Sequence, residues 1–457
     1  MTNEQSMLEM PGMRESTLLW KNPAGAFPYE YNGIPAESGA YRTSAWIGTA
    51  LSTSPVIDVV GPDAMAFLHS ICVNDFTKLK YTGIRHAVVC NEKGYILTDG
   101  VVIRLEENRY RTYWLNPPLT YLASITDLDV HLEDMTGQEY FIQVQGEKSL
   151  EILEDAFQAD LHDIKFAKHR TEDMDGRTVR IIRLGMSGNL AYEIHGPMAD
   201  YAYVYDKVIE SGKKFGAELQ GLHTYNLFNH TEAGFPNINL HYPMPWRESG
   251  EGLNAWVDAN PFAAMYNYAR KLTGSMGENL EDRFMTPYDV GWGFLVKFNH
   301  EFMGRAALEE AAKNPHRTPV TLEWNAEDVG KVFATRFVPG EEPCEDISIP
   351  TDAYLVDSFR EGRWIYRADK VLADEKEIGL SSGRIISYNY NAMISLGFID
   401  PAYAEDGREL MVVWGTPGTR QMNVRVKVAR FPYNGDLIRN ENKDVEEVPR
   451  FKGLSNR

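Results

Sequence analysis

Hydrophobic and polar residues alternate along the stretch SGNLAYEIHGP, residues 187–197. In an extended chain, Leu190, Tyr192 and Ile194 point to one side. Glu193 points to the other side. The alternation predicts a strand with one buried face, and the closing Gly-Pro pair indicates a turn. A glutamate at mid-strand is most often solvated; the alternative is that it serves a ligand that needs a hydrogen-bond acceptor.

The same succession of a strand, a turn and a helix is predicted twice in the chain. Residues 56–70 alternate and then pass through Gly-Pro-Asp, which is expected to cap the helix that follows. Residues 141–155 repeat this order around Gly146. Between the two, residues 86–115 are typical of a meander of strands joined by turns. The first half is therefore expected to combine antiparallel sheet with helices in a weak internal repeat.

A long segment with weak periodicity follows a helix that is predicted around residues 200–218. This segment, residues 237–285, is rich in aromatic side chains. A loop of that length inside a compact domain is often a lid or an insertion at the substrate site. The aromatic side chains of this insertion include Tyr242, Trp246, Trp256, Phe262, Tyr266 and Tyr268.

The C-terminal part of the chain has a different pattern. After a helix near residues 301–314, short strands separated by turns follow one another, which predicts a small barrel. We therefore predict an α+β protein in two regions. Residues 1–316 would hold two interleaved α+β domains, and residues 317–457 would form a β-barrel domain.

Composition narrows the classes of function. The chain has 457 residues, so more than one domain is expected, and no apolar run approaches the roughly 18 residues of a membrane span. A formal net charge of −19 argues against nucleic acid and anionic membranes as partners, because both attract clustered Lys and Arg. Cys72, Cys90 and Cys344 are too widely spaced for a disulfide framework. With no signal-peptide pattern at the N-terminus, these features predict a cytoplasmic protein.

Familiar cofactor and metal motifs are absent or incomplete. The sequence has no G-x-G-x-x-G after a strand, no P-loop, no H-E-x-x-H and no G-x-S-x-G. Asp160 and His162 resemble the start of a corrinoid-binding Asp-x-His-x-x-Gly signature, but Lys165 stands where glycine is needed. A polar strand face explains a second group of candidate ligands, namely Asp127, Asp129, His131 and Glu133. We therefore expect no metal site.

Four stretches together resemble the glycine-cleavage T-protein family of tetrahydrofolate-dependent methyl and aminomethyl transferases. They are VVGPDAMAFLHSICVND with CNEKGYILTDGVV, then FIQVQGEKSLEIL, then GNLAYEIHGP, and last the run from IGLSSGRIISYNY to VARFPYN. In this order and spacing they cover most of the chain. The resemblance implies three domains in a ring around a central folate channel, with a small C-terminal barrel.

Within that family the chain looks like the bacterial aromatic O-demethylases that act on vanillate and syringate, above all in residues 285–309. The resemblance implies an enzyme that moves a methyl group from a methoxylated aromatic compound to tetrahydrofolate, giving a phenol and 5-methyltetrahydrofolate. Two alternatives stay open. One is another one-carbon transfer on the same fold, from an aminomethyl, amine or sulfonium donor. The other is a folate-binding protein without catalysis.

The chain departs from the family pattern at three places. Residues 230–232 read His-Thr-Glu where the T-protein pattern has Arg-Leu-Glu. The segment 49–57 is shortened and lacks the histidine that the vanillate enzyme places near its substrate. Residues 114–118 read WLNPP where that enzyme has an arginine for the substrate carboxylate. We therefore expect a methyl donor that does not require a carboxylate.

The resemblance also implies roles for single residues. Tyr225 falls where those demethylases carry a tyrosine beside the methoxyl oxygen, so it is the expected general acid, with Tyr31 as its helper. A tyrosine suits the task because its ordinary pKa of about 10 matches a phenolic leaving group. Glu193 is expected to accept hydrogen bonds from the pterin ring. The remaining expected contacts are Asp99, Trp292, Gln143 and His223 for folate, and Tyr29 and Phe235 for the donor.

Three of these roles have a structural alternative. Asp99 also fits a turn or the end of a strand, Trp292 a tryptophan of the core, and Tyr225 a core tyrosine with a satisfied hydroxyl.

Overall fold

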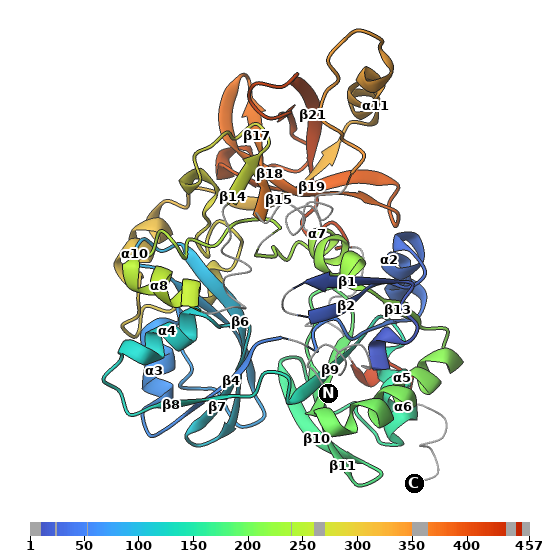
Figure 1. The fold of residues 1–457 in the computed structure, drawn as a ribbon, viewed down its shortest axis with the longest axis vertical. Coiled ribbons are helices and arrows are strands. Elements are labelled where there is room, and N and C mark those ends of the chain that lie inside the picture. The colour runs from blue at the N-terminus through green and yellow to red at the C-terminus, as the bar shows by residue number, and fades with distance from the viewer. Residues whose placement is uncertain are drawn as a thin grey trace.

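The computed structural model of the chain describes residues 11–22, 25–52, 54–238, 240–259, 270–349, 364–435 and 445–449. Two sheets covered by helices lie side by side in the lower half of Figure 1, and a barrel lies above them. This is the mixed architecture with a C-terminal barrel that the sequence predicts. The division into regions 1–316 and 317–457 stays a prediction.

The left-hand sheet of Figure 1 is antiparallel and has five strands. Two helices, α3 (Ala64–Ile71) and α4 (Pro118–Ile125), pack on it, and Phe67, Leu119 and Val59 are buried in their common core. The predicted strand, helix and meander are therefore confirmed. In spatial order the strands are β5 (Ile84–Cys90), β6 (Ile96–Glu106), β7 (Arg109–Tyr113), β4 (Val56–Val60) and β8 (His131–Asp134).

The right-hand sheet repeats the same plan with one strand added. Its chain order is a strand, helix α5 (Ser149–Phe157), a three-stranded meander, helix α6 (Tyr201–Lys214) and a returning strand, as in the left-hand sheet. The internal repeat predicted from the sequence is thus present in the topology. In spatial order the strands are β10 (Lys168–Met174), β11 (Arg177–Arg183), β12 (Ala191–Pro197), β9 (Glu139–Gln145), the added β3 (Trp46–Gly48) and β13 (Glu218–Gln220).

A glycine opens the turn between strand and helix in both sheets. Gly61 and Gly146 have φ values of 140° and 138°, and a Cβ on either would lie within 2.4 Å of a carbonyl oxygen of another segment. Only glycine fits such a turn. The prediction that the Gly-Pro-Asp turn caps α3 through Asp63 is wrong. Asp63 makes no side-chain cap, because its Oδ2 instead accepts a hydrogen bond of 2.9 Å from the backbone N–H of Asp129.

The barrel at the top of Figure 1 is closed. It follows helix α10 (Arg305–Lys313), and helix α11 (Ala326–Ala334) projects from it. Its interior is filled by aliphatic side chains and by Trp414, which is fully buried. In order around the barrel the strands are β15 (Thr318–Trp324), β19 (Ala392–Ile399), β18 (Lys376–Ser387), β17 (Asp369–Ala373), β20 (Glu409–Trp414) and β21 (Met422–Ala429).

The aromatic insertion at 237–285 has more regular structure than its sequence predicts. It contains helix α8 (Glu251–Ala259) and strand β14 (Arg270–Thr273), which pairs in parallel with β16 (Trp364–Arg367). Only Leu253 and Val257 of α8 are buried, so the hydrophobic stripe along this helix is short. The short stripe explains why the sequence has only weak helical periodicity here. Tyr242 and Trp246 are buried, whereas Trp256 is partly exposed. Phe262, Tyr266 and Tyr268 lie outside the described residues.

The remaining elements lie between the barrel and the right-hand sheet in Figure 1. They are the hairpin β1 (Leu18–Asn22) and β2 (Gly25–Glu30), helix α2 (Ile34–Thr43), a π-helix at Thr224–Asn229, and α7 (His230–Glu232). Short 3-10 turns are found at Pro11–Met13, Met198–Asp200, Glu281–Arg283, Gly293–Leu295, Thr335–Phe337, Pro401–Tyr403 and Val445–Glu447.

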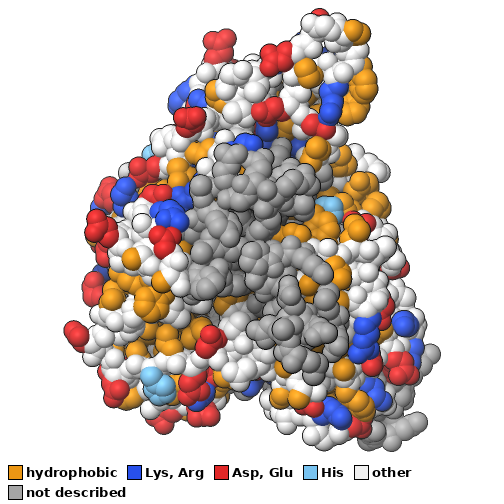
Figure 2. All heavy atoms as spheres, in the orientation of Figure 1, with side chains coloured by type: hydrophobic (Ala, Val, Ile, Leu, Met, Phe, Trp, Pro, Cys, Tyr) orange, Lys and Arg blue, Asp and Glu red, His pale blue; other side chains and the backbone are white. Residues whose placement is uncertain are grey.

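The charged side chains on the surface agree with the formal net charge of −19. On the face drawn in Figure 2, Asp and Glu side chains are spread over the left-hand part and the barrel. None of the helices in the described residues is long and apolar enough to cross a membrane.

Candidate functional site

A cavity of about 850 Å³ is lined by both sheets, the π-helix and the segments 234–246 and 290–297. Most of its wall is apolar or aromatic. Its acidic and imidazole groups are Asp75, Asp99, Glu193, His86, His195 and His230. A largely apolar cavity with a few converging polar groups is the usual form of a small-molecule site.

Glu193 and Gln143 face each other across two strands at the cavity wall. They are directly opposite in the β12–β9 pair, and the neighbouring residues Tyr192 and Ile194 fill the core on the other face, as the alternation predicts. Gln143 Nε2 donates to Glu193 Oε1 at 3.2 Å and lies 3.5 Å from Tyr225 Oη. Because the amide donates to the tyrosine oxygen, the hydroxyl hydrogen of Tyr225 remains available to another acceptor.

Tyr225 is carried into the cavity wall by the π-helix. Its side chain is 9% exposed, and burial raises the pKa of its hydroxyl, with the hydrogen bond from Gln143 acting in the opposite direction. The hydroxyl is therefore protonated at neutral pH and acts as a hydrogen-bond donor. A π-helix is rare in proteins and occurs mostly at functional sites.

Each sheet contributes a carboxylate paired with a histidine. On the left-hand sheet, Asp99 Oδ2 lies 2.9 Å from His86 Nε2. On the right-hand sheet, Glu193 Oε2 lies 3.3 Å from His195 Nε2, and His195 Nδ1 lies 3.2 Å from Tyr113 Oη. These contacts hold both carboxylates in place at the cavity.

His230 directly follows the π-helix and has one ring nitrogen fixed. Its Nδ1 lies 2.8 Å from the carbonyl oxygen of Phe235, and a carbonyl only accepts, so Nδ1 carries the hydrogen. Burial lowers the pKa of His230 to about 4, so the ring is neutral at pH 7. Its Nε2 therefore presents a lone pair. The ring stands edge-on to Tyr225, with centroids 5.6 Å apart.

The cavity brings together most of the residues expected from the sequence. Tyr225, Glu193, Asp99, Trp292 and Phe235 all line it. Gln143 lies behind them, in contact with both Glu193 and Tyr225. Asp99 is in the middle of strand β6 rather than in a turn.

Besides Gln143, three expected residues do not line the cavity. Tyr31 is buried outside the cavity lining, and its hydroxyl donates to the carbonyl oxygen of Gly12. Tyr29 and His223 stack on each other, with ring centroids 4.7 Å apart. His223 Nδ1 lies 3.4 Å from a carboxylate oxygen of Glu30.

Sequence reasoning missed the three histidines of the cavity. His195 lies two residues from Glu193 on the same face of the strand. The alternation along the strand therefore indicates that both side chains point to the same side. His86 and His230 carry no such signal. His86 reaches Asp99 across the β5–β6 hairpin, and His230 depends on the course of the π-helix.

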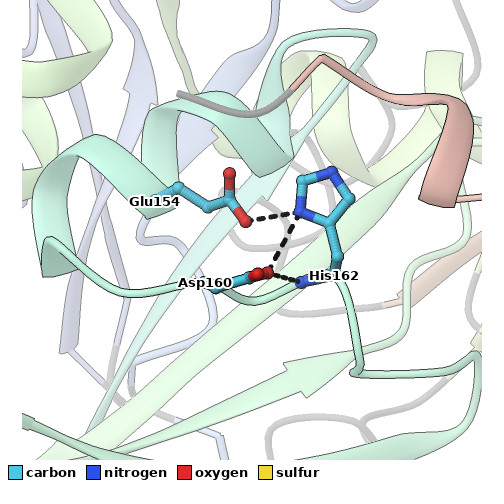
Figure 3. A group of neighbouring side chains, drawn as sticks. All are labelled: Glu154, Asp160 and His162. Carbon is cyan, nitrogen blue, oxygen red and sulfur yellow. Dashed lines mark hydrogen bonds and ion pairs between the residues drawn. The ribbon is translucent and has the colours of Figure 1, made fainter. Parts of the chain in front are cut away.

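A second group of carboxylates and a histidine lies away from the cavity, at the end of α5. In Figure 3, Glu154 and Asp160 both approach Nδ1 of His162, at 2.6 and 3.4 Å. The other ring nitrogen, Nε2, lies 2.8 Å from the carbonyl oxygen of Val448. These contacts connect the end of α5 to residues 445–449, which gives the group a structural role.

Relatives of known activity cover nearly the whole chain. Residues 14–240 match the family model described as the GCVT N-terminal domain. A protein of a Sinomonas species named sesamin methylene transferase is 49% identical over 430 residues, 93% of this chain and 94% of that relative. The syringate O-demethylase of a Sphingobium species is 31% identical over 440 residues, 89% of this chain and 91% of that relative.

A more distant similarity links the chain to aminomethyltransferases. The enzyme of Bacillus cereus is 26% identical over 334 residues, 71% of this chain and 80% of that relative. The crystal structure of the glycine cleavage system aminomethyltransferase T from Bartonella henselae matches with a TM-score of 0.65 and 18% identity, covering 92% of this chain and 95% of that one. The two chains therefore share a fold.

Proposed function

This chain belongs to the glycine-cleavage T-protein family of tetrahydrofolate-dependent transferases, and we propose that it moves a one-carbon group from an aryl ether to tetrahydrofolate. The names of two relatives support an aromatic donor. One is named for sesamin, which carries methylenedioxy groups, and the other for syringate, which carries methoxy groups.

The residues of the cavity fit tetrahydrofolate. Glu193 offers carboxylate oxygens to a pterin ring, whose N–H groups are donors, and Trp292 offers an aromatic surface. The cavity volume of about 850 Å³ lies within the usual range of small-molecule sites, roughly 300–1,000 Å³. When bound, tetrahydrofolate supplies the nitrogen that accepts the one-carbon group. We assign Glu193, with Gln143 beside it, to the pterin ring.

The hydroxyl of Tyr225 is the single observation that carries the proposal. An aryl ether is a poor donor because its leaving group is a phenolate, and a proton or hydrogen bond on the ether oxygen lowers that barrier. Tyr225 has its oxygen held by Gln143 and its hydrogen free for that task. Burial raises its pKa, but a phenolate forming in the same apolar cavity is destabilised in the same way. The two pKa values therefore stay matched.

Asp99 and His86 provide the complementary proton acceptor. Tyr225 would give a proton to the ether oxygen as its bond to carbon breaks, and Asp99 would take up the proton released when bound tetrahydrofolate accepts the one-carbon group. Asp99 lies in the cavity wall with His86 fixed against it at 2.9 Å. A carboxylate paired with a histidine is well suited to accept a proton.

Two donors are compatible with this site. A methoxylated aromatic compound would give a phenol and 5-methyltetrahydrofolate, as the resemblance to the demethylases implies. A methylenedioxy compound would give a catechol and 5,10-methylenetetrahydrofolate. The second candidate is favoured by the 49% identity to sesamin methylene transferase.

Turnover assays separate these candidates. The purified protein is incubated with tetrahydrofolate and guaiacol, vanillate, syringate, 1,3-benzodioxole or dimethylglycine, and the folate and phenol products are measured by chromatography. We expect 5-methyl- or 5,10-methylenetetrahydrofolate from at least one aryl ether, in equal amount to the phenol. Turnover of dimethylglycine with no product from any ether would refute the proposal.

A further inference from the structure

His230 has a hydrogen-bonding capacity that the proposed reaction does not use. Its Nδ1 hydrogen is fixed on the carbonyl oxygen of Phe235 at 2.8 Å. Within the described part of the chain its Nε2 has no hydrogen-bond partner, although the residue lines the cavity. A second buried histidine, His241, provides the contrast. Its Nδ1 accepts from the backbone N–H of Asn237 at 2.9 Å, and its Nε2 lies 3.1 Å from Thr231 Oγ1.

The ring of His230, with its free acceptor, stands beside the ring of Tyr225, with its free donor. The two rings are nearly perpendicular, at 84°, with centroids 5.6 Å apart. Both belong to the cavity wall. The wall therefore presents a hydroxyl hydrogen and a nitrogen lone pair on two neighbouring rings.

We propose that His230 is a specificity residue whose Nε2 accepts a hydrogen bond from a ring hydroxyl next to the ether oxygen that Tyr225 serves. This inference rests on the proposed function, because that function makes Tyr225 the donor to an ether oxygen. It assigns to the site a ring with two neighbouring oxygens, one an acceptor and one a donor.

The chemistry of aryl ethers explains the pairing. A 2-methoxyphenol has an ether oxygen for Tyr225 and a hydroxyl for His230. A methylenedioxy ring acquires the same hydroxyl once its first carbon–oxygen bond is open, and both kinds of donor end as a catechol. A ring with two methoxy groups would instead place an oxygen lone pair against the nitrogen lone pair, which leaves a buried polar group unsatisfied.

Calorimetry without folate tests this inference on three probes, catechol, guaiacol and 1,2-dimethoxybenzene. The wild-type protein is expected to bind catechol and guaiacol about tenfold more tightly than 1,2-dimethoxybenzene, the effect of one hydrogen bond of ordinary strength. The ratio of affinities is compared between variants, so that differences in the size of the probes cancel.

Two substitutions separate recognition from structure. His230→Asn keeps a donor near the position of Nδ1 and removes Nε2, so we expect a ratio near one with an unchanged melting temperature. His230→Gln places a side-chain oxygen near the position of Nε2, so we expect it to restore part of the preference. Asn and Gln thus differ in which of the two ring nitrogens they imitate.

Three outcomes would overturn the inference. They are a wild-type protein that binds none of the probes, a wild-type protein without preference, and a His230→Asn variant that keeps the preference. A fall in melting temperature with an unchanged ratio would assign His230 to structure alone. The turnover assay tests the proposed function separately. That function fails if no ether gives a one-carbon product.

Discussion

Burial keeps two polar side chains of the cavity uncharged. It raises the pKa of Tyr225 and lowers that of His230, so at neutral pH the first is an uncharged donor and the second an uncharged acceptor. The carboxylates of Asp99 and Glu193 are each held within 3.3 Å of a histidine nitrogen.

The first prediction concerns Tyr225→Phe, which keeps the ring and removes the hydroxyl. Because the hydroxyl acts on the bond that breaks, kcat should fall by about 10²–10⁴ with KM little changed. Steady-state kinetics and a melting curve on the same variant provide the check. A core tyrosine without a catalytic role would show a lower melting temperature and an almost normal kcat.

The second prediction concerns Glu193→Ala, which removes the carboxylate at the proposed pterin position. Folate binding should weaken by about 1–3 kcal/mol, the effect of leaving buried donors without a partner. Isothermal calorimetry with tetrahydrofolate measures this change. Glu172→Ala is the matched control, because Glu172 lies in β10 of the same sheet and pairs with Arg170, away from the cavity. Equal loss of affinity in both variants would contradict the assignment.

At the scale of elements, the π-helix sets the relation between Tyr225 and His230. In a regular α-helix two residues five positions apart would point about 140° away from each other. The wider turn of a π-helix, with its i to i+5 hydrogen bonds, brings them closer to one face. The start of the π-helix is fixed by Glu37, whose Oε2 accepts from Gly221 N at 2.8 Å and from Thr224 Oγ1 at 3.2 Å.

The third prediction is that Glu37→Gln loosens this element. Glu37 is fully buried, and its other oxygen accepts from the backbone N–H groups of Tyr31 and Asn32 at 2.7 and 3.0 Å. An amide has only one acceptor oxygen, so two of these donors would lose their partner. The free energy of unfolding should fall by about 1–3 kcal/mol. Urea denaturation tests this, with Glu278→Gln at an exposed position as the control.

The sequence predicts elements whose periodicity is set by local burial. Strand β12 follows the alternation around Glu193, and the glycines at 61 and 146 mark the two strand-to-helix turns. The sequence does not predict features that depend on distant partners. The side chain of Asp63 accepts a hydrogen bond from the backbone N–H of Asp129 instead of capping its own helix. The hydroxyl of Tyr31 donates to the carbonyl oxygen of Gly12. The π-helix has no periodic signal in the sequence, and its start is held by Glu37 from another helix.

At the scale of the whole molecule, buried polar groups connect the sheets and the barrel. Arg111 of the left-hand sheet binds Asp58 of that sheet at 2.7 Å and also Glu139 of the right-hand sheet. Glu232, which follows the π-helix, accepts a hydrogen bond of 2.6 Å from Ser387 of the barrel. The cavity lies among the elements that these contacts connect, so its shape depends on these contacts.

The fourth prediction tests the link between the sheets. Arg111→Met leaves Asp58, which is fully buried, with Arg109 alone, and it leaves Glu139 with only the hydroxyl of Tyr113 among the described residues. Breaking a buried pair from one side should lower the free energy of unfolding by about 3–5 kcal/mol. Chemical denaturation provides the measurement. Arg305→Met removes two i,i+4 pairs with the exposed residues Glu301 and Glu309 and should have a much smaller effect. Similar losses in both variants would contradict the structural role of Arg111.

The position of residues 445–449 has a consequence for how the chain is made. Val445 and Val448 fill the core of the right-hand sheet, and His162 holds the carbonyl of Val448, yet these valines follow the whole barrel in the sequence. During synthesis the ribosome delivers the right-hand sheet long before it delivers these two side chains. Domains usually fold in the order of synthesis, N-terminal first. The core of the right-hand sheet is therefore closed only after a segment that follows the barrel has been made.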